Sequence, residues 1–294
     1  MRRLTKNGAR STGMNGKVKI ASAMLIWGSV GIFARFSGLS GTGVAFARVS
    51  LGFLLLLAVV GLFDRESLNE IPGLIRERWK PLLGLGTALA LNWAFLFTAF
   101  NYTSIANAVL VYYTAPILAT LISWRFLGER ISGKRWALIG LAFLGLALII
   151  GGQKLSLDDR DFVGVILAFI AALFYALIPN FGRFLRDVDG KLLTLLQLGI
   201  ASLVLLPFVV VQKTGEPVWW AILVLVVVHT VLALFLYMDG LKTVEVNEAA
   251  LLSYLDPLSA VVYAFLVFGE VPGATTAIGG ALILLASALD VLRR

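Results

Sequence analysis

Ten long runs of apolar residues, separated by short polar connections, dominate this sequence of 294 residues. A helix that crosses a bilayer needs about 20 consecutive, predominantly apolar residues, and each run is close to that length. Charged residues make up only 14% of the chain, against about 25% in soluble domains, so there is too little polar surface to cover a globule in water. The sequence therefore predicts an all-α integral membrane protein with ten transmembrane helices, over residues 18–36, 43–63, 81–101, 104–126, 136–152, 162–184, 192–212, 218–240, 245–268 and 273–292.

The lysines and arginines are sorted between alternate connections. If the amino terminus is cytoplasmic, 20 of the 25 fall on the cytoplasmic side and four on the other, and Arg48 lies inside a span. Basic residues concentrate in cytoplasmic loops of membrane proteins, so we expect a bacterial cytoplasmic (inner) membrane protein with both termini in the cytoplasm. This sorting also argues against a nucleic-acid surface, in which basic residues cluster on one face of a folded domain.

The two halves of the chain repeat each other. A shift of 141 residues aligns the fourth run with the ninth and matches Ala108, Leu110, Tyr113, Pro116, Ala119, Gly128 and Glu129 with Ala249, Leu251, Tyr254, Pro257, Ala260, Gly269 and Glu270. We therefore predict a cytoplasmic tail (1–17), a five-helix repeat (18–152), a linker (153–161) and a second repeat (162–294). Five spans per repeat is an odd number, so the second repeat would be inverted relative to the first. Inverted repeats around a central site recur in secondary transporters.

Several short motifs resemble the EamA domain of the drug/metabolite transporter superfamily. They are Leu25-Ile26-Trp27-Gly28-Ser29, Ala47-Arg48 leading into Leu51, Tyr102-Thr103-Ser104, Gly128-Glu129-Arg130 and, in the second copy, Gly269-Glu270. The second copy departs from the first at Val244-Glu245-Val246, which stands where the first has Thr103-Ser104-Ile105. The resemblance implies a ten-helix transporter with helices 1–4 and 6–9 around a cavity, helices 5 and 10 at the periphery, and bacterial exporters of aromatic and other neutral amino acids as the nearest branch.

Three ionisable side chains inside the predicted spans are candidates for substrate binding, because charges in the bilayer are costly. Arg48 would bind a substrate carboxylate, or else reach the interface and cap a neighbouring helix. Asp256, just before Pro257, would bind an ammonium group or a coupling proton, or else bond to loosened helix ends. His229 titrates near neutral pH when unperturbed and would couple protons, or else link two helices by hydrogen bonds.

Aromatic and amide side chains complete the predicted substrate pocket. A pocket for an apolar or aromatic side chain is lined by rings with a few polar groups, although rings also serve as ordinary packing. The aromatic candidates are Trp27, Trp93, Tyr112, Tyr113, Tyr175 and Tyr254, and the amide candidates are Asn92 and Asn180.

Prolines and glycines suggest where the helices bend and pack. Pro116 and Pro257 occupy matching places in the two repeats and are candidate hinges, or else static kinks. The Gly-Glu pairs at 128–129 and 269–270 are expected to end helices and cap short connections. Gly140 and Gly145 in the fifth span, and Gly279 and Gly280 in the tenth, would allow close helix packing or a dimer contact.

The leading functional hypothesis is export of small metabolites, foremost neutral or aromatic amino acids, by alternating access. The alternatives are export of drugs or other metabolites, and a channel-like facilitator. An enzyme is disfavoured because the chain has no Cys, one His and no H-E-x-x-H or G-x-S-x-G motif. We expect no cofactor and no metal, and as partners a small-molecule substrate and the lipid bilayer, for a monomer or homodimer.

Overall fold

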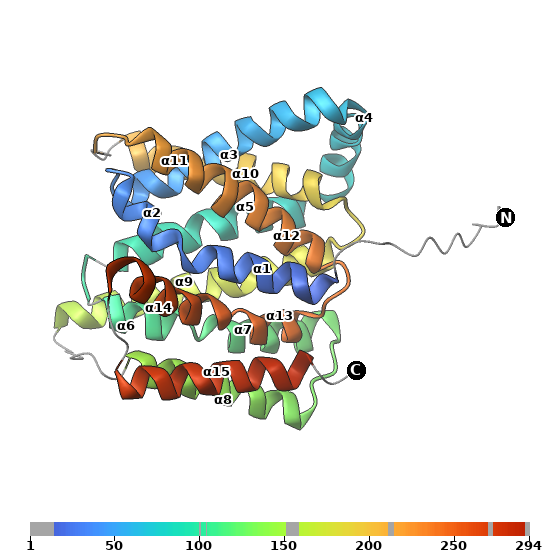
Figure 1. Cartoon of the computed structure of the whole chain (residues 1–294). Helices are drawn as coiled ribbons and strands as arrows, with labels where there is room; N and C mark the ends of the chain where they lie inside the picture. Colours follow the sequence, from blue (N-terminus) through green and yellow to red (C-terminus); the bar gives the residue numbers. More distant parts are fainter. Residues whose placement is uncertain are drawn as a thin grey trace.

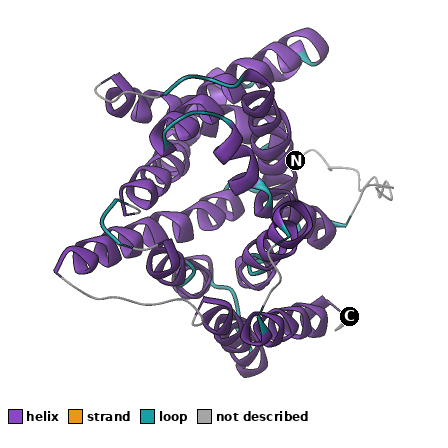
Figure 2. Cartoon of the chain, turned by 60° about the vertical axis from the view of Figure 1, so that its left-hand side comes forward, coloured by secondary structure: helices purple, strands orange, loops and turns teal. Residues whose placement is uncertain are grey.

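The computed structural model describes residues 15–99, 101–103, 105–150, 159–210, 215–269 and 273–291, and every regular element within these ranges is helical (Figures 1 and 2). The elements are α1 (Gly16–Gly28), α2 (Val30–Phe36), α3 (Gly41–Phe63), α4 (Arg65–Leu68), α5 (Ile71–Ala99), α6 (Ile105–Tyr112), α7 (Ala115–Ile122), the π-helix η1 (Ser123–Leu127), α8 (Gly133–Ile150), α9 (Asp159–Phe184), α10 (Gly190–Val210), α11 (Trp219–Val226), the π-helix η2 (Val227–Leu232), α12 (Ala233–Gly240), α13 (Val246–Leu252), α14 (Leu255–Phe268) and α15 (Ala274–Val291).

Seven helical segments in the described part are long and apolar enough to cross a membrane. They are Gly16–Ala34, Gly41–Phe63, Ile71–Ala99, Phe162–Phe184, Gly190–Val209, Trp219–Gly240 and Val246–Val267. The other three expected spans, 104–126, 136–152 and 273–292, contain shorter or interrupted helices. Residues 1–14 of the predicted tail and 153–158 of the predicted linker lie outside the described residues, whereas residues 159–161 of that linker already belong to α9.

One predicted boundary was wrong by ten residues. The third span was expected to begin at residue 81, but α5 begins at Ile71 and continues through Pro81. Non-helical dihedral angles at Arg78 (φ −125°, ψ 19°) bend the helix just before the proline. A proline is tolerated there because the bend already removes the regular hydrogen bond that its ring would block. The charges at Arg76, Arg78 and Lys80 resembled a loop, but they belong to the exposed first turns of this helix.

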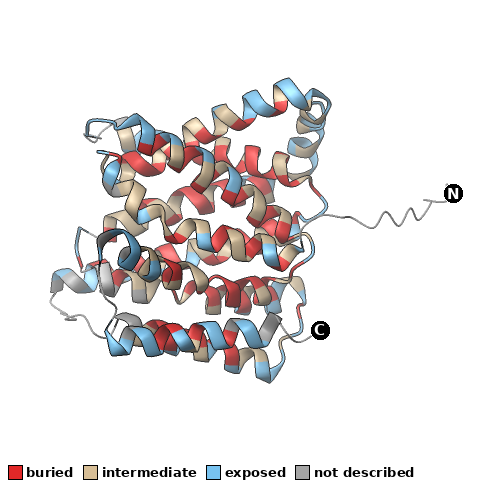
Figure 3. Ribbon diagram, in the orientation of Figure 1, coloured by how far each residue is buried: buried red, intermediate tan, exposed pale blue. Residues whose placement is uncertain are grey.

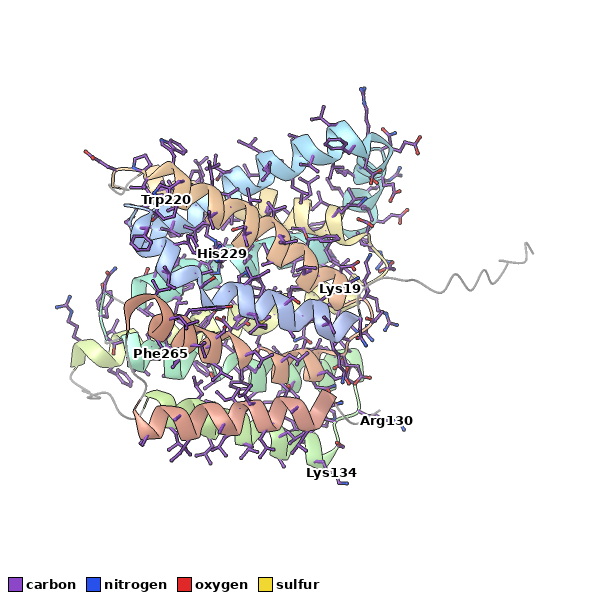
Figure 4. The ribbon with its side chains drawn as sticks, viewed as in Figure 1. Lys19, Arg130, Lys134, Trp220, His229 and Phe265 are labelled. Carbon is purple, nitrogen blue, oxygen red and sulfur yellow. The ribbon has the colours of Figure 1, made fainter. Side chains whose placement is uncertain are left out.

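The bundle has one basic end, where α1 begins and α15 ends (Figure 1). Lys19, Arg130 and Lys134 lie at this end, whereas Trp220 lies at the opposite end (Figure 4). Exposed residues lie on the outer helices of the bundle (Figure 3). Many of the exposed residues have large apolar side chains, among them Leu203, which is 72% exposed. Apolar surface of this extent is stable in lipid and not in water, so the protein is an integral membrane protein.

Two helix breaks have the same form in the two halves of the chain. α6 ends at Tyr112 and α7 resumes at Ala115, just before Pro116. α13 ends at Leu252 and α14 resumes at Leu255, two residues before Pro257. Both interrupted segments then end on a glycine with φ 69°, Gly128 and Gly269, as the Gly-Glu pairs predicted. The predicted hinge prolines therefore both follow a discontinuity, although movement at these breaks remains a prediction.

The basic end is closed by a group of contacts that we call the basic-end network, formed by Glu129, Arg135, Asn247 and Glu248. The Glu129 carboxylate accepts hydrogen bonds from the backbone amides of Val246 (2.9 Å) and Asn247 (3.3 Å), and from the Asn247 side chain (2.9 Å). It thus caps the amino terminus of α13, where unpaired N–H groups favour an anion. Arg135 donates to Asn247 and, at 3.1 Å, to Glu248. Residues 129 and 135, from the first half, are thereby joined to the second.

The helices α8 and α15 pack against each other at one edge of the bundle (Figure 1). A Cβ atom on Gly145 would lie 2.5 Å from the carbonyl oxygen of Gly279. No side chain larger than hydrogen fits between the two backbones at this point. Gly145 and Gly279 therefore allow close packing within one chain, as the sequence suggested.

This contact predicts opposite effects for two glycine-to-alanine substitutions in α8. Gly145→Ala should lower the free energy of unfolding by about 1–3 kcal/mol, because the backbones must separate. Gly140→Ala is the matched control, since a Cβ there would meet nothing within 4 Å, and alanine is favoured over glycine in a helix by up to about 1 kcal/mol. Thermal unfolding of the purified variants in detergent measures the difference; equal stabilities would contradict the packing.

Candidate functional site

A cavity of about 240 Å³ lies between eight of the helices. It is slightly smaller than typical small-molecule sites of about 300–1,000 Å³. The described residues of α8 and α15 contribute nothing to its wall, as the resemblance implied for the fifth and tenth helices. The expected seventh helix, α10, contributes nothing either, although the resemblance implied that it would. The lining residues are Trp27, Val30, Arg48, Leu89, Asn92, Trp93, Leu96, Phe97, Val109, Tyr112, Tyr113, Tyr175, Ile178, Leu234, Tyr237 and Asp256.

Most of the predicted binding residues meet at this cavity, although they come from distant parts of the sequence. Trp27, Arg48, Asn92, Trp93, Tyr112, Tyr113, Tyr175 and Asp256 all line it. Arg48 and Asp256 place one cation and one carboxylate in the lining of the same cavity, and no direct ion pair joins them among the described residues. Within that part of the chain, no group of three or more His, Cys, Asp or Glu side chains could hold a metal ion.

Two hydrogen bonds hold Arg48 against the segment α11–η2–α12, and the ring of Trp93 covers its guanidinium group. Its Nε donates to the Thr230 hydroxyl and its Nη2 to the His229 carbonyl, both at 2.9 Å. The guanidinium carbon lies 4.2 Å from the centre of the Trp93 ring, a cation–π geometry. A guanidinium has five N–H groups, and these two bonds use two of them. Arg48 therefore bonds to a neighbouring helix, but it does so where it is buried and at the middle of that helix, not as a cap at the interface as the sequence alternative had it. Three of its N–H groups are left for other partners.

The π-helix η2 supplies the carbonyl that holds Arg48. In an α-helix the amide of Ala233 would bond to the His229 carbonyl, but here it bonds to Val228 and Thr230 instead. The freed His229 carbonyl accepts from Arg48 and also from the Trp27 indole at 2.8 Å. Single-turn π-helices are frequent at functional sites. This one positions two residues of the cavity wall with a single backbone oxygen.

The carboxylate of Asp256 lies at the second helix break. It accepts a hydrogen bond of 2.8 Å from the Tyr113 hydroxyl. The Tyr254 hydroxyl in turn donates to the Tyr113 carbonyl at 3.4 Å. Tyr113 and Tyr254 are related by the 141-residue shift, so the two interrupted helices contact each other through matching tyrosines.

Polar and aromatic side chains of α5, α6 and α9 also line the cavity. Asn92 donates to the Tyr112 hydroxyl at 3.1 Å and to the Ala171 carbonyl at 3.0 Å. The Tyr112 ring stacks on Tyr175 with centroids 5.2 Å apart. These contacts fix the rings of α6 and α9 and leave an apolar, flat-walled space.

Three predicted residues lie outside the cavity wall. His229 is 2% exposed, with its ring nitrogens 2.8 Å from the Ser29 hydroxyl and 3.2 Å from the Val224 carbonyl, and its position among the helices is labelled in Figure 4. Asn180 donates to the Ala119 carbonyl at 3.1 Å and so links α9 to α7. Tyr254 is fully buried behind Tyr113. The bonds of His229 match the helix-linking alternative that the sequence left open for it; a direct part in transport stays a prediction for all three residues.

Two aromatic residues of the wall were not predicted. Tyr237 packs on Trp27 with centroids 5.4 Å apart, and Phe97 lies toward the end of α5. Tyr237 is a tyrosine inside an apolar run, like the tyrosines that were predicted, so the same sequence criterion would have identified it. Phe97 is one of 19 phenylalanines, and nothing in its surroundings distinguishes it.

Further hollows lie on either side of the cavity. Toward the end opposite the basic end, a polar hollow of about 450 Å³ shares Phe97 with it and is lined by Ser40, Gly41, Thr42, Thr98, Asn101, Tyr102 and Arg160. Toward the basic end, Tyr175 and Tyr237 separate it from a void of about 10 Å³, which has room for no more than one water. The described part of the chain is thus hollow on one side of the cavity and nearly closed on the other.

The hydrogen bond from Arg48 to Thr230 predicts that removing the Thr230 hydroxyl lowers the stability of the protein. Thr230→Val keeps the shape but leaves Nε of a buried arginine unpaired, which should lower the free energy of unfolding by about 1–3 kcal/mol. Thr230→Ser should restore most of the loss. Thr194→Val is the control, because that buried hydroxyl bonds only to the Gly190 carbonyl of its own helix. Unfolding of the purified variants measures these effects, and equal losses at both positions would contradict the role of Thr230.

Known proteins resemble the chain over nearly its whole length. The model of the EamA-like transporter family matches residues 14–151 and 162–291. An uncharacterised transporter of Bacillus subtilis, YxxF, is 29% identical over 94% of this chain and 89% of its own. One from Archaeoglobus fulgidus is 30% identical over 92% and 93%. An S-adenosylmethionine uptake transporter of Rickettsia conorii is 23% identical over 85% and 82%.

A protein of known crystal structure has the same fold, with a TM-score of 0.83 and 21% identity over 94% of this chain and 96% of its own. The family model covers both halves of the chain separately, and the relatives are named as transporters. Together with the membrane-facing surface and the central cavity, these similarities show that the chain belongs to the EamA-like transporter family, within the drug/metabolite transporter superfamily.

Proposed function

We propose that this protein is a secondary transporter that exports small zwitterionic metabolites, foremost neutral and aromatic amino acids, across the cytoplasmic membrane by alternating access. The observation that carries the proposal is that Arg48 and Asp256 line one aromatic cavity. In that cavity the amino acid's carboxylate would bind Arg48 and its ammonium group Asp256. The side chain would lie among Trp27, Tyr112 and Tyr175.

The charge balance of the wall favours a zwitterion over a singly charged ligand. Groups with buried charge are stable when an opposite charge compensates them, and a zwitterion compensates both residues at once. A phosphorylated substrate would need more cations, and Arg48 is the only Lys or Arg among the described residues that line the cavity. The volume of about 240 Å³ suits a small metabolite.

A ten-helix organisation in two inverted repeats is part of the proposal. Support comes from the matching breaks at Tyr113 and Tyr254 and from the separate family matches to residues 14–151 and 162–291. In such transporters the two halves exchange conformations around a central site. Pro116 and Pro257 would be the hinges at which the interrupted helices bend.

The basic end would be the cytoplasmic one, because basic residues concentrate on that side. The cavity would then be open toward the outside through the polar hollow beyond Phe97 and closed toward the cytoplasm by Tyr175, Tyr237 and the basic-end network. A continuously open channel, the alternative mechanism, is disfavoured by the narrow void of about 10 Å³.

Counterflow in proteoliposomes tests the substrate class. We expect saturable uptake of labelled neutral and aromatic amino acids when the same unlabelled amino acid is inside. S-adenosylmethionine belongs in the panel because of the Rickettsia relative, together with acidic amino acids and a sugar phosphate as controls. Non-saturable flux without counterflow would indicate a channel, and counterflow of other compounds alone would refute amino-acid export.

Two charge-removing substitutions test the binding orientation. A substrate analogue that lacks the ammonium group can still bind through its carboxylate, and Arg48→Gln should weaken its competition with labelled substrate about tenfold or more. The reason is that a charged hydrogen bond contributes about 1.5–3 kcal/mol. Competition by an analogue that lacks the carboxylate should be unchanged in this variant. Asp256→Asn should give the reverse pattern. Arg65→Gln, at an exposed position in α4, controls for net charge. If both site variants weaken both analogues equally, the proposed orientation is wrong.

The basic-end network predicts a shift between conformations. Glu129→Gln removes a charge that caps α13, and we expect the cavity to open toward the basic end more often. The chain has no cysteine, so Ala250→Cys, at the void of 10 Å³, can report access to a membrane-impermeant thiol reagent. Its labelling from the basic side should rise about tenfold in the Glu129→Gln background. Glu66→Gln at the same end is the control, and unchanged labelling would exclude Glu129 from the closure.

A further inference from the structure

A second charged hollow lies at the basic end, away from the central cavity. It has a volume of about 480 Å³ and is lined by Leu127, Gly128, Glu129, Arg130, Arg183, Phe184, Arg186 and Glu245. None of these residues lines the central cavity. The hollow forms where three connections meet: the end of η1, the end of α9 and the segment before α13.

The two acidic side chains of this hollow already have partners. Glu129 accepts from the amino terminus of α13, and Glu245 accepts a hydrogen bond of 3.1 Å from Asn247. Arg183 is also engaged, because it donates to the carbonyls of Leu241 at 3.0 Å and Lys242 at 2.7 Å. Glu129 also lies 3.8 Å from Arg183. Among the described residues, neither acid makes a hydrogen bond or an ion pair with the two remaining arginines.

Arg130 and Arg186 are the exposed cations of the hollow. Neither guanidinium has a hydrogen-bond or ion-pair partner among the described residues. Arg130 projects at the basic end (Figure 4). Two unpaired guanidiniums beside one polar hollow offer an anion two planar sets of donors, the geometry that suits a phosphate group.

Exposed aromatic residues line the hollow or precede its lining residues in the sequence. Phe184, which lines it, is 53% exposed. Phe126 and Trp124, one turn or less before Leu127, are 75% and 58% exposed. Aromatic side chains at the end of a membrane-spanning segment lie at the level of the lipid headgroups, so the hollow lies where a headgroup phosphate meets its acyl chains.

We propose that this hollow binds the headgroup of an anionic phospholipid, with the phosphate between Arg130 and Arg186 and the acyl chains against Phe126 and Phe184. A lipid fits better than a soluble anion because its apolar chains would cover the exposed rings. Basic pockets between helices at the cytoplasmic side of membrane proteins commonly hold such headgroups. The site is independent of the transported substrate and requires only that the protein spans a bilayer.

Native mass spectrometry of the purified full-length protein tests this site with phosphatidylglycerol and phosphatidylcholine as probes. We expect saturable, one-site binding of phosphatidylglycerol that phosphatidylcholine does not match. The double variant Arg130→Gln/Arg186→Gln should bind phosphatidylglycerol about tenfold more weakly. The double variant Arg65→Gln/Arg76→Gln is the matched control, because it removes the same charge at exposed positions of α4 and α5.

Three results would overturn the proposal. Equal weakening by both double variants would mean that phosphatidylglycerol responds only to net surface charge. Equal binding of phosphatidylcholine would mean that the hollow does not select an anionic headgroup. Displacement of phosphatidylglycerol by millimolar inorganic phosphate would indicate a site for a soluble anion. The double variant Arg130→Lys/Arg186→Lys keeps the charge and loses the planar donors, so it should bind phosphatidylglycerol with intermediate affinity. This result would also show that the weaker binding of the Gln variant is not caused by a folding defect.

Discussion

A bilayer offers no water to backbone groups, and this constraint shapes every irregular feature of the bundle. Each helix break leaves N–H or C=O groups that must find a partner inside the protein. The His229 carbonyl, freed in η2, accepts from Arg48 and Trp27. The Tyr113 carbonyl, at the break before Pro116, accepts from Tyr254. Both interruptions therefore contribute to the wall of the central cavity.

The same constraint explains why the cavity can hold charges. Arg48 is 4% exposed, and an isolated guanidinium at such a site would be unstable. Its bonds to Thr230 and His229 and its contact with Trp93 compensate part of that cost, while Asp256 across the cavity is bonded to Tyr113. Neither charge has a full set of partners from the protein, so a ligand that carries both opposite charges would stabilise the pair.

The sequence predicted the membrane class, the approximate helices and half of the 16 residues that line the cavity, including both charged ones, because apolar runs and intramembrane polar residues have direct physical meaning. It did not predict η2, since a π-helix depends on a single displaced hydrogen bond that leaves no compositional signal. It also placed His229 in the substrate pocket on its chemistry alone, whereas its side chain faces Ser29 and only its backbone carbonyl serves the cavity wall. The early start of α5 was missed because charged residues and Pro81 resemble a loop.

The most direct test of the cavity's role is an experimental structure of the protein with a bound neutral amino acid. We expect ligand density in the central cavity, with the carboxylate at Arg48 and the ammonium group at Asp256. Density for the amino acid only in the polar hollow beyond Phe97, with the central cavity holding water alone, would contradict the assignment of this cavity as the substrate site.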